Sequence, residues 1–153
     1  MAGGGIPRPE VLSVERLDQY LIGIVVTHFA VVLVHSVAHL YLGIVPALPD
    51  AAFILVVIMG GPLVALLIVR VNRPFTSGLL AVLMGAAFAY GFDSHFLAAG
   101  PDHVLLVASD SRTALFVVSA ALIGVLELAA LLLAALVFAA AARSPSAPAG
   151  PRA

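Results

Sequence analysis

The chain alternates between four long apolar stretches and short segments rich in proline, glycine or charge. The apolar stretches cover about residues 17–43, 51–69, 76–97 and 112–142. Each is close to, or longer than, the roughly 20 apolar residues with which an α-helix crosses a bilayer. The pattern therefore predicts an all-α membrane protein, a four-helix transmembrane bundle with short loops, formed by residues 10–143.

The segments around these stretches carry turn-forming residues. Pro46 and Pro49 follow the first stretch, and a Gly-Pro-Asp turn lies in the segment 98–111. Glycine, proline and serine dominate residues 1–9 and 144–153. Such compositions do not support a packed core. We expect a disordered leader and a disordered tail at these two ends.

Glycine and proline also interrupt two of the apolar stretches. Pro62 follows Gly60 and Gly61 at the centre of the second stretch, where the missing backbone N–H predicts a kink. Small residues such as Gly85 and Gly91 in the third stretch allow a neighbouring helix to approach closely. Faces of this kind can bind a second membrane protein or another copy of the chain.

The arginines predict the orientation of the bundle. In a four-span arrangement only Arg112 falls on one side, and six arginines fall on the other: Arg8, Arg16, Arg70, Arg73, Arg143 and Arg152. Because positive residues concentrate on the cytoplasmic side, we expect both termini to be cytoplasmic. The expected location is the plasma membrane of a prokaryote.

Composition agrees with lipid as the surrounding medium. The chain is 63% hydrophobic and 10% charged, with a mean hydropathy of +1.18, whereas soluble domains contain roughly 25% charged residues. It has no cysteine, which excludes disulfides, thiolate metal ligands and thiol catalysis. A net charge of -1 and the absence of a basic run give no indication of nucleic-acid binding.

Three histidines lie in the first apolar stretch, where ionisable residues are rare and point to function. Spacings of seven and four residues place His28, His35 and His39 on one stripe of a helix. His35 and His39 are i and i+4, so both imidazoles can reach one ion. The motif lacks the glutamate of H-E-x-x-H, which argues against a zincin protease.

Further potential ligands follow the third stretch. Asp93 and His95 lie at its end, and Asp102 and His103 follow the Gly-Pro turn. If that loop folds back, these residues converge with the first stretch in the outward-facing third of the bundle. The candidate metal ligands are His35, His39, Asp93, His95 and His103. Nitrogen and carboxylate ligands without sulfur suit Zn, Fe, Mn or Cu(II).

A b-type haem is the alternative cofactor. Four-helix membrane bundles can hold haem between axial histidines of two helices. His35 or His39 would pair with His95, and Gly91 or Gly124 would leave room for the porphyrin. Against haem, the partner helix offers only one histidine within the membrane.

A second polar layer is expected deeper in the bundle. With Leu42 and Thr113 as the outer boundaries, the helical rise places both His28 and Glu127 about 21 Å inside. An ionised carboxylate alone at that depth is costly. Glu127 is therefore either protonated or paired with His28, as a structural hydrogen bond or as a proton relay.

No motif identifies a reaction, and three classes of function remain. The first is a metal or haem protein for redox chemistry or metal handling, with its site in the outer third. The second is a structural or accessory subunit of a larger membrane complex. The third is a proton or small-solute conductor that uses Glu127 and His28.

Overall fold

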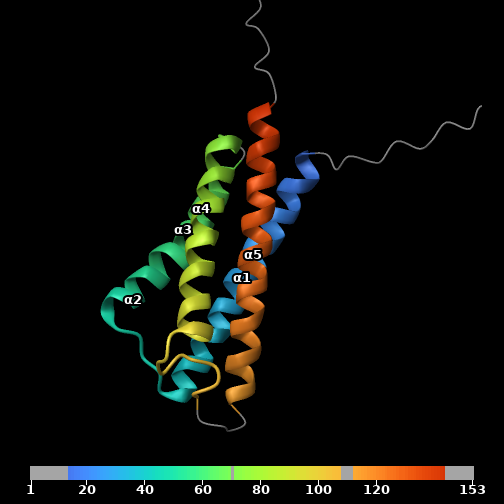
Figure 1. The fold of residues 1–153 in the computed structure, drawn as a ribbon. Coiled ribbons are helices and arrows are strands. Elements are labelled where there is room, and N and C mark those ends of the chain that lie inside the picture. The colour runs from blue at the N-terminus through green and yellow to red at the C-terminus, as the bar shows by residue number, and fades with distance from the viewer. Residues whose placement is uncertain (1–13, 70, 108–111, 144–153) are drawn as a thin grey trace, which may run out of the picture.

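A computed structural model describes residues 14–69, 71–107 and 112–143 (Figure 1). This part of the chain is helical, with no strand, and contains four helical stretches long and apolar enough to cross a membrane. The stretches are Glu15–Leu42, Leu48–Leu67, Arg73–Leu97 and Thr113–Arg143. The expected all-α architecture, with four helical stretches long and apolar enough to cross a membrane, is confirmed.

The elements follow the chain in a simple order. Helix α1 (Val14–Leu42) is the first span, α4 (Arg73–Phe92) continues into the π-helix η2 (Asp93–Leu97), and α5 (Thr113–Arg143) is the last span. The second span has three parts, namely α2 (Leu48–Phe53), the π-helix η1 (Ile54–Gly60) and α3 (Gly61–Leu67).

Helix α5 packs between α1 and α4, and the second span packs mainly on α4. In Figure 1 the start of α1, the end of α5 and the α3–α4 connection share one end of the bundle. The α1–α2 connection and the loop after η2 lie at the opposite end. Which end faces the cytoplasm stays a prediction, and residues 1–9 and 144–153, the expected leader and tail, lie outside the described residues.

Small side chains in α5 allow the three long helices to pack closely. Ala130 and Ala134 are fully buried against larger residues of the neighbouring spans, namely Leu21, Val25, Leu80 and Met84. Toward the end with the α1–α2 connection, a second buried cluster consists of Val32, Ile58, Ala87 and Ile123. Near the other end Arg73 donates a hydrogen bond to the Asp18 carboxylate, which joins α4 to α1.

Local sequence determines where α1 ends. Gly43 has a φ of 69°, a left-handed conformation that glycine adopts without a steric penalty. The Gly43 N–H donates to Leu40 O and the Ile44 N–H donates to His39 O, at 3.2 and 3.0 Å. These two bonds form a Schellman cap. The cap ends the helix one turn after His39, so this histidine lies at the edge of the bundle.

The second span accommodates Pro62 through a π-helix. The kink expected at this proline stays a prediction, and the structure has the wider turns of η1 directly before α3. The Gly61 N–H bonds to Val56 O, five residues back. A Cβ on Gly60 would lie 2.9 Å from Leu55 O, so the wide turn requires a glycine at this position.

Candidate metal centre

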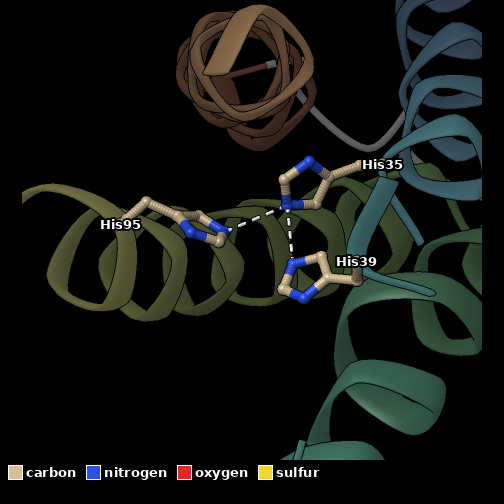
Figure 2. A group of neighbouring side chains, drawn as sticks. All are labelled: His35, His39 and His95. Carbon is tan, nitrogen blue, oxygen red and sulfur yellow. Dashed lines mark hydrogen bonds between the residues drawn. The ribbon is translucent and has the colours of Figure 1, made fainter. Parts of the chain in front are cut away.

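Three histidines from two spans converge at the end of the bundle with the α1–α2 connection (Figure 2). His35 and His39 come from the last turns of α1, and His95 comes from η2. The Nε2 atom of His35 lies 3.3 Å from Nε2 of His95 and 3.0 Å from Nε2 of His39. The ligand atoms of all three lie within 4.8 Å of one another, close enough to share one ion.

The π-helix η2 brings His95 into this cluster. Its last turn closes with a bond from the Ala98 N–H to Asp93 O, five residues back, at 2.7 Å. The following loop folds back, because the Val104 N–H donates to His95 O at 3.0 Å. Wide turns change the direction of the side chains that follow and occur frequently at functional sites.

Ser119 of α5 holds His35 from the side opposite the cluster. The Ser119 hydroxyl has one hydrogen, which is directed to Leu115 O at 2.6 Å. Its oxygen therefore accepts the hydrogen bond from His35 Nδ1–H, at 2.8 Å. With the proton on Nδ1, the lone pair of His35 Nε2 points at the other two histidines.

Asp102 supports the other two rings. His95 Nδ1–H donates to the Asp102 backbone oxygen at 3.0 Å, so the Nε2 atom of His95 also carries a lone pair. The carboxylate oxygen Oδ1 of the same residue lies 3.7 Å from His39 Nδ1. Two of the three imidazoles, those of His35 and His95, thus donate from Nδ1 to an oxygen, as histidine metal ligands typically do. His39 Nδ1 has the carboxylate nearby but no hydrogen bond.

The three Nε2 atoms are placed so that one metal ion could lie between them. With both protons on Nδ1, the contact between His35 and His95 joins two acceptors, which repel each other at 3.3 Å. Nitrogens bound to a tetrahedral zinc at about 2.0–2.1 Å lie about 3.3 Å apart. The spacing of the two acceptors thus fits one shared metal ion.

Phe116 forms an apolar wall behind the cluster. Its ring is fully buried, and its centroid lies 5.0 Å from that of His35, 5.1 Å from that of His39 and 5.5 Å from that of His95. These contacts restrict the rotation of all three imidazoles.

At the same end, Arg112 donates to Tyr41 O at 3.1 Å and joins the start of α5 to the end of α1.

Asp93 and His103 lie outside the group that can share an ion. The Asp93 side chain is exposed, and the residue contributes its backbone oxygen to η2. His103 lies in the following turn, where its Nδ1 accepts from the Leu105 N–H at 3.2 Å. Asp102, and not Asp93, is thus the acidic residue beside the histidines, because the loop folds over the cluster while the start of η2 faces away.

His28 and Glu127 meet deeper in the bundle, as their equal predicted depth implied. His28 Nε2 lies 3.2 Å from Glu127 Oε1, and both side chains are 1% exposed. The second carboxyl oxygen, Oε2, is buried and has no hydrogen-bond partner. The pair joins α1 to α5 and leaves one polar atom of Glu127 unsatisfied.

A cavity of about 320 Å³ connects the two polar layers. The three histidines and Asp102 line one part of it, and Glu127 lines another. Most of the remaining wall is apolar and comes from α1, η1, the end of α4 and α5, including Val32, Ile54, Ile58, Met59, Phe92 and Ile123. A metal ion held by the histidines would therefore face an apolar chamber.

Ser119 and Phe116 are the residues of the site that sequence reasoning missed. Ser119 lies six residues beyond Thr113, which corresponds to a depth of about 9 Å by helical rise. The same count from Leu42 places His35 about 10 Å deep. Equal depth on α1 and α5 could therefore have predicted the contact between Ser119 and His35, as it predicted the contact between His28 and Glu127.

Comparisons with known proteins identify no relative of this chain. No protein-family model matches it, no curated protein matches its sequence, and no solved structure matches its fold. Evidence on function therefore comes from the site itself.

Proposed function

We propose that this protein is an integral membrane protein that binds one transition-metal ion through Nε2 of His35, His39 and His95. The observation that carries the proposal is the convergence of three imidazoles, two of which donate from Nδ1 to oxygens of Ser119 and Asp102. Such outer contacts orient a histidine and favour the tautomer that binds metal.

The three nitrogen donors favour a single divalent transition-metal ion such as Zn²⁺. Three neutral imidazoles without sulfur suit Zn²⁺, Cu²⁺ or Fe²⁺. Three protein ligands leave a fourth tetrahedral position open, which is the arrangement of catalytic rather than structural zinc sites. Because the three histidines also line the cavity, the open position faces it. An ion there would act as a Lewis acid on a molecule in the cavity.

The same spacing disfavours a haem between His35 and His95. Two axial nitrogens on opposite sides of one iron lie about 4 Å apart, twice a metal–nitrogen bond of about 2 Å. The two Nε2 atoms are 3.3 Å apart, and His39 lies against the same point at 3.0 Å. A porphyrin ring would have to displace His39.

The orientation rests on the arginines. The predicted cytoplasmic side is the one with both termini. The end of α1 and the η2 loop, which carry the histidines, lie at the opposite end of the bundle (Figure 1). The metal site is therefore proposed to face outward from a prokaryotic plasma membrane.

A zinc titration of the detergent-purified, chelator-treated protein tests this function. We expect one Zn²⁺ per chain, and a loss of affinity of about 100-fold or more in His35→Ala or His95→Gln, since even outer-shell changes cost 10–100-fold. His103→Ala is the matched control, because this histidine lies outside the cluster. Thermal unfolding of each variant checks that it folds.

Absence of stoichiometric zinc, copper or iron in the folded protein would overturn the proposal. An equal loss in His103→Ala would do the same, because binding would then not depend on the cluster.

A further inference from the structure

The cavity beside the histidines opens sideways, toward the surface that a bilayer would cover. Leu40 of α1 and Leu55 of η1 both line it, and both side chains are largely exposed, at 72% and 62%. A residue that lines a cavity and is also exposed marks its rim. Val45 of the α1–α2 connection also lines the cavity and is 78% exposed, so the rim runs from α1 and η1 to the end of the bundle. The three rim residues are apolar, which favours entry of apolar molecules from lipid.

The inner end of the cavity has a polar atom without a partner. Glu127 is 1% exposed, and its Oε2 atom has no hydrogen bond. A buried polar atom in this condition is costly. Gly91 lies opposite, where a Cβ would be 3.7 Å from Oε2, so no side chain at this position covers the oxygen. A ligand group that forms a hydrogen bond with Oε2 would offset the cost.

The two polar ends of the cavity, at the histidine cluster and at Glu127, are separated by a distance similar to the length of a small molecule. Ser119, which contacts His35, lies eight residues before Glu127 on α5, or about 12 Å along the helix. The cavity volume of about 320 Å³ lies within the range of small-molecule sites, about 300–1,000 Å³. The space is thus elongated, apolar along its sides and polar at both ends.

We propose that the cavity binds a neutral, membrane-soluble molecule with an apolar body and a polar atom at each end. One end coordinates the open position of the metal ion, and the other forms a hydrogen bond with Glu127 Oε2. This assignment of a ligand class rests on the proposed metal site. The apolar walls select against charged or strongly hydrated molecules, whose desolvation would not be compensated.

Three probes of increasing match test the inference on the Co²⁺-loaded protein, after Co²⁺ binding has been verified. They are imidazole, 4-phenylimidazole and 4-(4-hydroxyphenyl)imidazole, and binding is followed in the visible spectrum of the metal. Burial of the phenyl ring should raise the affinity over imidazole about 10-fold or more. The added hydroxyl group should raise it again by several-fold through Glu127.

Two variants assign these gains to the cavity. Gly124→Leu should abolish the gain in affinity from the phenyl ring, because the leucine side chain would fill the cavity that Gly124 lines. The backbone tolerates this change, since a Cβ there lies 4.0 Å from Phe88. Gly91→Val should abolish only the gain from the hydroxyl group, because it covers Oε2. Gly23→Leu is the control, since a Cβ there meets nothing within 4 Å and this glycine does not line the cavity.

The outcomes separate this inference from the proposed function. Co²⁺ binding with equal affinity for imidazole and 4-phenylimidazole would overturn the cavity ligand and leave the metal site intact. A gain that survives Gly124→Leu would also overturn it, since the ring would then bind elsewhere, for example in detergent. Failure to bind Co²⁺ would overturn both.

Discussion

Ser119 Oγ accepts a hydrogen bond from His35 Nδ1 at 2.8 Å and thereby joins the last span to the first at the histidine cluster. The contact directs the Nε2 lone pair of His35 toward His39 and His95. Both partners are buried, so water does not replace either of them. One hydroxyl group from α5 thus determines the orientation of a candidate metal ligand on α1.

Replacement of Ser119 by alanine should weaken zinc binding about 10–100-fold while the fold is retained. The reason is that His35 Nδ1 loses its acceptor and the ring can take the wrong tautomer. A competition titration with a chromophoric chelator measures the affinity. Ser36→Ala is the matched control, because the Ser36 hydroxyl bonds to Val32 O of its own helix. Equal effects of the two changes would contradict this role of Ser119.

The two aspartates near the site should behave differently. Asp102→Asn should lower zinc affinity by up to about 10-fold, since its carboxylate lies 3.7 Å from His39 Nδ1 and an outer-shell carboxylate raises ligand basicity. Asp93→Asn should leave the affinity unchanged, because this side chain is exposed and outside the cluster. The same titration distinguishes them, and a larger effect at Asp93 would show that the loop folds differently.

The contact between His28 and Glu127 should appear as a coupling energy between α1 and α5. A double-mutant cycle with His28→Leu and Glu127→Leu, measured by unfolding in mixed micelles, should give a coupling of about 1 kcal/mol. This is the usual strength of a hydrogen bond between membrane helices. Additive effects of the two single changes would argue that the 3.2 Å contact does not form.

The π-helix in the second span should depend on Gly60. Gly60→Ala should lower the free energy of unfolding by about 1–3 kcal/mol, as overpacking does, because its Cβ would lie 2.9 Å from Leu55 O. Gly23→Ala is the control, with nothing within 4 Å of the added carbon. Thermal unfolding in detergent compares the two, and a neutral effect at Gly60 would mean that the span is a regular α-helix.

The all-α architecture could be predicted from the hydropathy pattern alone. Apolar runs of spanning length leave few alternatives to helices, and their ends carry local signals. Gly43 caps α1, and Asn72 caps α4 by accepting from the Phe75 N–H at 3.2 Å. The wide turns of η1 and η2 could not be predicted from the sequence, because their geometry depends on tertiary packing around Pro62 and on the loop that folds over His95.

The candidate site could be predicted in part, from the spacing of its residues along the helices. The i, i+4 spacing of His35 and His39 implied that the two imidazoles face one point, and they do. Which acidic residue joins them was not determined by spacing, because it depends on the path of the loop after η2. That path places Asp102 beside the histidines and leaves Asp93 exposed.

X-ray absorption spectroscopy of the zinc-loaded protein tests the central claim most directly, because it reports the ligands around the ion. The account predicts three imidazole nitrogens at about 2.0–2.1 Å and one further light atom at the open position. Loss of one imidazole from this shell in His95→Gln would place that ligand on η2. A shell with one imidazole or none in the unaltered protein would contradict the metal site.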